Sequence, residues 1–356
     1  MKKILLCWLA AATALTAGAQ SNEWQDAGVN AVNRMPMHGS WFAYESPEAA
    51  QAGDKTLSER FVTLNGNWKF NWVRNADQRP TDFFRVGYND KGWSDMPVPG
   101  LWELNGYGDP VYLNVGYAWR GWFKNDPPHV PIEQNHVGSY RRTVDIPAAW
   151  AGRQIVAHFG SVTSNIYLWV NGRYVGYSED SKLEAEFDVT RYITPGRDNL
   201  IVLRINRWCD GSFLEDQDFW RLSGIGRDCY LYARDKRRLA DVRLTPDLVD
   251  DYRNGTLRAE IATTPGIGSV RLTLRDDEGR TLDTRTLRPR RNSAETLFEV
   301  AAPKQWSAEA PNLYTLTAEA LAADGSVIEQ NDYYPFGKEW AQPDMPTSDN
   351  RYTFSG

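Results

Sequence analysis

The sequence predicts an all-β protein built from two β-sandwiches. Many short segments alternate apolar and polar residues with a period of two, and Gly, Pro and Asn residues separate them. Sustained helical periodicity is missing beyond the first 19 residues. Short strands with regular turn signals are typical of sandwiches, and 356 residues are enough for two domains with cores of their own.

The first 19 residues read as a secretory signal peptide. Residues 1–3 carry two lysines, residues 4–10 are apolar, and residues 17–19 form a small-x-small cleavage site, so we expect cleavage after Ala19. The apolar run is too short for a membrane span. Gln20 stands where bacterial acylation would need a Cys. The sequence therefore predicts a periplasmic or secreted protein without a membrane span.

Residues 20–60 form a loop-rich entry segment, and residues 61–235 form the first predicted sandwich. Its clearest predicted strands cover residues 67–72, 164–170, 173–177, 200–205 and 229–233.

Two Asn-Gly pairs predict turns in this domain. Asn171-Gly172 joins two β-rich segments and predicts a type I′ hairpin, because this pair tolerates positive φ angles. Asn65-Gly66 predicts a turn before a strand with alternating aromatic residues.

A charged bridge at residues 235–238 leads into the second predicted domain, residues 236–334. The segments 257–261, 270–274 and 314–319 alternate with period two, and turns at 277–279 and 324–325 give an immunoglobulin-like spacing. We interpret this domain as a spacer without chemistry. Residues 335–356 show no strand or helix pattern, and we expect them to be disordered.

Composition excludes some functions and leaves others open. The net charge is −6 and no large basic block occurs, so nucleic acid is not an expected partner. The 15 Trp and 17 Tyr residues suit sugar binding, although we assign most Trp residues to the core. Cys209 and Cys229 could form a disulfide or stay as free thiols. Cys7 lies in the predicted signal peptide, and the two thiols that remain with four scattered His residues do not indicate a zinc site.

The segment 211–228 is the strongest functional signal. It places Glu215, Asp216 and Asp218 next to Phe219 and Trp220. Burying unpaired carboxylates costs several kcal/mol, so we expect this loop to face a ligand. The alternative is a solvated turn with one capping Asp.

This loop resembles the matching loop of bacterial β-galactosidases of glycoside hydrolase family 2. The order Glu-Asp-Gln-Asp-aromatic-Trp-Arg at residues 215–221 favours that branch over glucuronidases and mannosidases. The resemblance extends to about Asp332, and further segments that carry it are 97–103, 106–115, 127–131, 138–140, 171–177, 186–188 and 306–314.

The resemblance implies a galactose-binding-like jelly roll, an immunoglobulin-like sandwich and then a (β/α)₈ barrel. In this family the barrel carries two Glu residues, an acid/base and a nucleophile, for retaining hydrolysis of terminal β-D-galactosides, together with the Mg²⁺ ligands. Here the sequence departs from the family after Tyr334, so we expect a truncated or frame-shifted product without the barrel. Catalytic residues are then absent, the chain alone has no turnover, and a homo-oligomer is possible only for the full-length enzyme.

The resemblance also assigns two residues of this chain. Asp218 matches an aspartate that reaches the galactose site and coordinates Na⁺, here as a partial site because the other ligands belong to the barrel. Asn114 matches an asparagine that hydrogen-bonds sugar hydroxyls, although it could instead hold the loop 112–122.

Glu215 and Asp216 have a different expected role. We expect them to orient Arg221 or Arg227, and we do not assign Asp216 and Asp218 as a catalytic pair.

Two other functions stay open at this stage. The chain could be a stand-alone periplasmic carbohydrate-binding module, or a non-functional remnant whose exposed barrel-docking face promotes aggregation.

Overall fold

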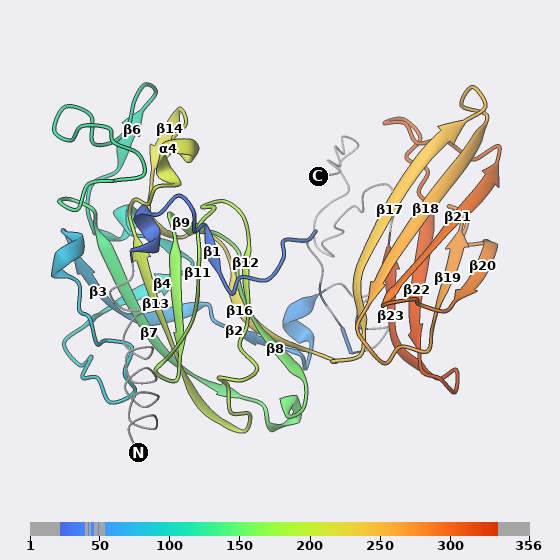
Figure 1. Ribbon diagram of the computed structural model, residues 1–356, viewed down its shortest axis with the longest axis horizontal. Helices are drawn as coiled ribbons and strands as arrows, with labels where there is room; N and C mark the ends of the chain where they lie inside the picture. Colours follow the sequence, from blue (N-terminus) through green and yellow to red (C-terminus); the bar gives the residue numbers. More distant parts are fainter. Residues whose placement is uncertain (1–21, 40–41, 43, 46–48, 50–53, 334–356) are drawn as a thin grey trace, which may run out of the picture. The chain divides into compact units, whose positions relative to one another are not determined.

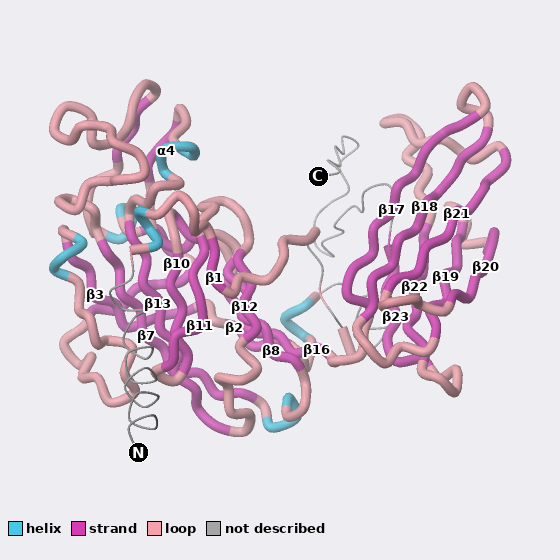
Figure 2. Tube along the Cα trace, in the orientation of Figure 1, coloured by secondary structure: helices cyan, strands magenta, loops and turns pink. Residues whose placement is uncertain are grey.

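The computed structural model describes residues 22–39, 42, 44–45, 49 and 54–333 (Figure 1). They form two compact units, one with strands β1 to β16 and the other with strands β17 to β23. Strands dominate both units, and helix is confined to short segments such as α4, Ser212–Glu215 (Figure 2). The all-β prediction of a jelly-roll sandwich followed by an immunoglobulin-like sandwich is confirmed. The predicted signal peptide, residues 1–19, and the predicted disordered tail, residues 335–356, lie outside the described residues.

Two antiparallel sheets form the first unit. The seven-stranded sheet has the order β1 (Ala31–Val32), β11 (Arg173–Ser178), β10 (Ile166–Val170), β13 (Arg197–Asn206), β7 (Val137–Ile146), β3 (Gly66–Val73) and β4 (Ser94–Val98). The four-stranded sheet has the order β12 (Ala185–Asp188), β8 (Gln154–Phe159), β16 (Cys229–Arg234) and β2 (Phe61–Thr63).

Two small sheets extend this sandwich. One is a ribbon of two strands, β6 (Val111–Leu113) and β14 (Phe219–Arg221). The other has the order β5 (Gly100–Leu101), β15 (Gly224–Ile225) and β9 (Val162–Thr163).

The seven-stranded sheet is covered on both faces. Every residue of β10 is buried: Ile166 and Leu168 belong to the core shared with the four-stranded sheet, whereas Tyr167 and Trp169 belong to a second, aromatic core on the opposite face. Alternate residues of a strand point to opposite faces, so a continuous apolar run fits a sheet without a solvent face.

Most of the Trp side chains that the structure describes serve as core residues, as expected. Trp68, Trp102 and Trp150 are at most 1% exposed, and each indole N–H finds an acceptor inside the protein. A buried indole needs such an acceptor, because an unpaired polar group in the interior is costly.

The two Asn-Gly pairs have different outcomes. Asn171 (φ 50°) and Gly172 (φ 78°) join β10 to β11 and confirm the predicted hairpin. Asn65-Gly66 lies at the start of β3, and the preceding strand β2 belongs to the other large sheet. This turn therefore crosses between the layers of the sandwich.

The entry segment is bound to the edge of the seven-stranded sheet. β1 pairs with β11, the side-chain amide of Asn33 donates to the Val175 carbonyl at 2.8 Å, and Arg34 forms an ion pair of 2.8 Å with Asp180. Two residues are too short a strand for a periodicity argument, and the sequence did not predict it.

The second unit is a sandwich of three and four strands. Its sheets have the orders β17 (Leu239–Val249), β18 (Asn254–Thr263), β21 (Ser293–Ala301), and β20 (Thr281–Leu287), β19 (Ser269–Arg275), β22 (Thr315–Leu321), β23 (Val327–Tyr333). Residues such as Leu257, Leu272, Phe298 and Leu316 fill the core between them. The strands predicted at 257–261, 270–274 and 314–319 fall in β18, β19 and β22, and the two predicted turns join consecutive antiparallel strands.

Candidate functional site

The acidic segment folds as part of a two-stranded ribbon and not as a free loop. After β13, the chain forms α4 and then β14, which pairs antiparallel with β6 (Figure 1). Aromatic residues in both short strands, together with Val111 in β6, favour this pairing. The sequence showed the loop but not its partner, because the two strands lie more than 100 residues apart.

The ribbon brings the two predicted sugar-binding positions together. Phe219 pairs with Leu113, so Asp218 and Asn114 are the next residues beyond this pair on the two strands. Both residues are exposed. Their roles in sugar binding stay predictions.

Tyr112 fixes the carboxylate of Asp218. The Tyr112 hydroxyl donates to Asp218 Oδ1 at 2.6 Å, and this hydrogen bond raises the pKa of Tyr112. The ring of Tyr112 also packs on Trp220, its cross-strand partner, with 5.6 Å between the ring centroids. The sequence gave no reason to select Tyr112.

Asp216 has the role expected of it. It forms an ion pair with Arg221, and both side chains are about nine-tenths buried. Arg221 also donates to the carbonyl groups of Phe219 and Leu113, so it links the two strands of the ribbon. Burial raises the pKa of Asp216, and Arg221 opposes this effect.

Glu215 was predicted to orient an arginine, and this is wrong. Its carboxylate accepts hydrogen bonds from the backbone N–H of Ser181, at 3.0 Å, and from the Ser181 hydroxyl. Arg227 instead donates to the carbonyl groups of Gly160 and Lys182. Ser181 lies in the turn after β11, where its backbone N–H needs an acceptor, and the Glu215 carboxylate provides it. Sequence spacing does not reveal such a partner.

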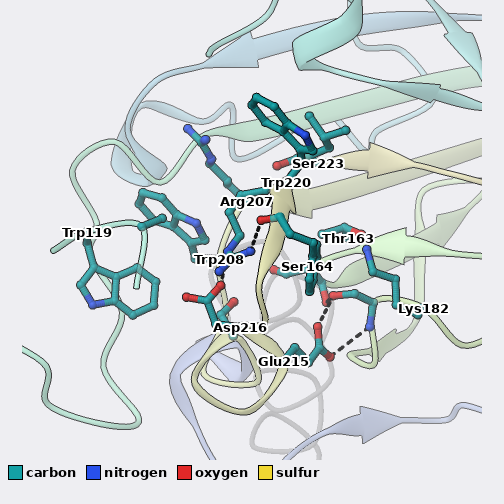
Figure 3. A pocket seen from close by; sticks show the side chains of 16 residues that line it. Trp119, Thr163, Ser164, Lys182, Arg207, Trp208, Glu215, Asp216, Trp220 and Ser223 are labelled. Atoms are coloured by element: carbon teal, nitrogen blue, oxygen red, sulfur yellow. Dashed lines mark hydrogen bonds and ion pairs between the residues drawn. The ribbon is translucent and has the colours of Figure 1, made fainter. Parts of the chain in front are cut away.

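A small cavity of about 50 Å³ lies beneath the ribbon. Figure 3 shows Trp119 and Trp208 on one side of it and Lys182 with Glu215 on the other. Burial lowers the pKa of Lys182, and Glu215 opposes this effect. Ligand pockets usually measure about 300–1,000 Å³, so this cavity suits a few water molecules and not a sugar ring.

Asp218 is suitable as one oxygen ligand of a cation but does not form a cation site alone. One carboxylate oxygen is engaged by Tyr112, and a hard cation such as Na⁺ needs several oxygen ligands. The prediction of Na⁺ at a partial site therefore fits the donor chemistry of this residue. No residue of the chain is assigned to Mg²⁺.

In the part of the chain that the structure describes, one buried trio has donor atoms close enough to hold a metal ion. These residues are Glu179, Cys209 and Asp210. Burial and the neighbouring Asp210 raise the pKa of Glu179 to about 9, and Tyr177 donates to its carboxyl group. Burial also raises the pKa of the Cys209 thiol well above its usual value.

Cys209 and Cys229 are both free thiols and both buried. Cys209 lies in the aromatic core and Cys229 in the core between the two large sheets. Of the two alternatives that the sequence left open, the structure has free thiols.

Known proteins are similar to the chain over both units. The family model described as "Glycosyl hydrolases family 2, sugar binding domain" matches residues 61–235, and the model described as "Glycosyl hydrolases family 2" matches residues 237–337. A β-galactosidase of Halalkalibacterium halodurans is 37% identical over 308 residues, which are 86% of this chain and 30% of that protein. A β-galactosidase of Aeromonas hydrophila is 38% identical over 330 residues, which are 87% of this chain and 31% of that protein.

Solved structures of other proteins share the fold of this chain. The β-glucuronidase of Bifidobacterium dentium superposes with a TM-score of 0.61 at 20% identity, over 78% of this chain and 48% of that one. The chain spans about 30% of the length of the curated relatives that it matches. It belongs to glycosyl hydrolase family 2, with β-galactosidases as its curated relatives.

Proposed function

We propose that this chain is the sugar-binding and immunoglobulin-like portion of a β-galactosidase that hydrolyses terminal β-D-galactosides with retention of configuration. The observation that carries the proposal is the end of the β6–β14 ribbon. There, Asn114 and Asp218 lie at adjacent positions, exposed, with the Asp218 carboxylate held by Tyr112. An amide and a carboxylate together donate and accept hydrogen bonds, as recognition of sugar hydroxyls requires.

The acidic residues of the ribbon do not supply the catalytic pair. Retaining hydrolysis needs two carboxyl groups about 5 Å apart that both reach the sugar. Asp216 is buried against Arg221, Glu215 is bound to Ser181, and only Asp218 is exposed beside the ribbon. We therefore propose that the catalytic carboxylates lie outside these 356 residues, in agreement with the length of the relatives.

Two assays test this proposal. The purified 356-residue chain should not release nitrophenol from nitrophenyl β-galactoside, whereas the protein with the continuing reading frame should do so, giving the β-anomer first in ¹H NMR spectra. In that longer protein, Asp218→Ala should raise KM for the galactoside and remove the response to Na⁺. Turnover by the short chain that Asp218→Ala abolishes would refute the assignment of the catalytic groups.

The second candidate function is a stand-alone carbohydrate-binding module. The pair Tyr112 and Trp220 favours it, because both rings are about half exposed and pack against each other beside Asp218. Titration of the 356-residue chain with galactose and lactose discriminates between the two functions. Submillimolar binding supports the module, and absence of binding supports a portion that needs the rest of an enzyme.

We further propose export of the protein after cleavage at Ala19. None of the described helices is both long and apolar enough to cross a membrane. Amino-terminal sequencing of material from the periplasm or medium should begin at Gln20, and an intact Met1 on that material would contradict the proposal.

A further inference from the structure

The loop that joins β17 to β18 in the second unit has an uncommon backbone. Three consecutive residues, Asp250, Asp251 and Tyr252, have φ angles between 55° and 63°. Ala302, just after β21, also has a positive φ of 45°. Non-glycine residues in this region cost conformational free energy, and such residues concentrate at functional sites.

These strained segments line the same open depression of the surface. Asp250, Tyr252, Arg253 and Asn254 contribute from the β17–β18 loop, and Ala302 and Gln305 contribute from the segment after β21. The two strands that this loop joins, β17 and β18, are labelled in Figure 1.

Hydrogen bonds hold the depression in one conformation. The Gln305 side-chain amide donates to the Tyr252 carbonyl at 2.6 Å, and the Asn254 amide donates to the Asp250 carboxylate at 2.8 Å. The backbone N–H of Ala302 donates to Asn254 Oδ1 at 3.3 Å. The two segments are therefore cross-linked, and a ligand would meet a surface that is already ordered.

The chemistry of the depression fits a neutral sugar. Tyr252 is 69% exposed and offers an aromatic face for the C–H face of a pyranose ring. Carboxylate, guanidinium and amide groups around it can bind hydroxyl groups in both directions. The lining carries one acidic group, Asp250, and one basic group, Arg253, so its charges cancel and favour neither an anionic nor a cationic ligand.

We propose that this depression is a second saccharide-binding site, with Tyr252 as its stacking platform. It goes beyond the proposed hydrolase function, because it lies in the domain interpreted from the sequence as a spacer and needs no catalytic group. Its part would be to hold a glycan in addition to the sugar bound by the first unit.

Ligand-observed saturation-transfer NMR on the 356-residue chain tests the proposal, with galactose, lactose and galactotetraose as probes. The Asp218→Ala variant serves as background so that sugar binding at the β6–β14 ribbon contributes little. We expect saturable binding that Tyr252→Ala weakens at least about tenfold and that Tyr252→Phe retains. Leu282→Ala, which removes a 43% exposed apolar side chain from the same unit, is the matched control and should bind normally.

Two results would overturn the proposal: no saturable binding of any of the three sugars, or binding that Tyr252→Ala leaves unchanged. Circular dichroism should show the same fold for every variant, because each altered side chain is exposed. Loss of galactosidase activity in the longer protein would bear on the proposed function and not on this site.

Discussion

The hydroxyl of Tyr112 holds the carboxylate of Asp218 at the exposed end of a two-stranded ribbon, with 2.6 Å between the two oxygen atoms. The hydrogen bond joins residues of β6 and of the acidic segment that are 106 positions apart. A carboxylate on a ribbon end would otherwise sample several orientations. Tyr112 therefore determines where Asp218 points.

In the longer protein proposed above, Tyr112→Phe should weaken galactoside binding by about tenfold or more, because the Asp218 carboxylate loses the hydrogen bond that orients it. The ring contact with Trp220 persists in this variant, so the thermal unfolding temperature should stay nearly constant. Inhibition kinetics with galactose measure the effect. Tyr112→Ala removes the ring as well and should bind more weakly than Tyr112→Phe; equal affinity of wild type and Tyr112→Phe would contradict this role.

Arg221→Ala should destabilise the first unit by about 2–4 kcal/mol, because it leaves the buried carboxylate of Asp216 without its partner. Urea unfolding followed by fluorescence measures the loss. Arg227→Ala is the control: Arg227 is exposed and donates only to carbonyl groups, so its replacement should cost about 0.5 kcal/mol or less. The double variant Asp216→Asn/Arg221→Ala should be more stable than Arg221→Ala alone, since the unpaired charge is gone. Equal losses at Arg221 and Arg227 would show that the ion pair contributes little.

His38 should make attachment of the entry segment depend on pH. Its Nδ1 faces the Gly39 carbonyl at 2.8 Å and its Nε2 faces Glu186 at 3.0 Å, so both ring nitrogens must donate, which only the imidazolium can do. The hydrogen bond to Glu186 raises the pKa of His38. Burial raises the pKa of Glu186, but hydrogen bonds from His158 and His38 outweigh it and lower this pKa to about 2.

The directions of the pKa shifts of His38 and Glu186 define a pH range in which the entry segment is held most firmly. The His38 contribution is complete below its unfolded pKa of about 6.5 and is lost as pH rises through the higher folded value. The Glu186 contribution is present above its unfolded pKa of about 4.5 and is lost as pH falls toward 2. Hydrogen exchange of residues 31–39 should therefore be slowest between about pH 4.5 and 6.5 after correction for the intrinsic rate. His38→Gln should abolish the decline of protection above this window, and an unchanged profile in that variant would exclude His38 as its cause.

Gly176→Ala should destabilise the first unit by about 1–3 kcal/mol, because a Cβ atom at this buried position would collide with the Val32 carbonyl oxygen and lie 2.8 Å from the Phe187 ring. The collision would push β1 away from β11. Gly87→Ala is the matched control, since a Cβ atom there meets nothing within 4 Å and its φ is not positive. Thermal unfolding of both variants measures the difference. Similar unfolding temperatures would mean that β1 can move away from β11 without loss of stability.

Local signals of the sequence predicted the fold well, and non-local pairing limited the prediction of the site. The hairpin at Asn171-Gly172 and the buried strand β13 follow from turn chemistry and apolar runs, which act within a few residues. The ribbon, in contrast, depends on Tyr112 and Trp220 meeting across the chain. Glu215 was assigned to an arginine because opposite charges attract. Its carboxylate instead accepts from the backbone N–H of Ser181, a partner that no sequence pattern reveals.

Labelling of the two buried thiols can report how the first unit unfolds. Cys209 and Cys229 are each 0% exposed, in cores on opposite sides of the seven-stranded sheet, and the pKa of each is raised by burial. A maleimide can label either one only after that side has come apart, since the reactive thiolate is suppressed while the core is closed. Equal labelling rates would mean that both cores become accessible together in one cooperative unfolding step. Unequal rates would show which of the two cores opens first.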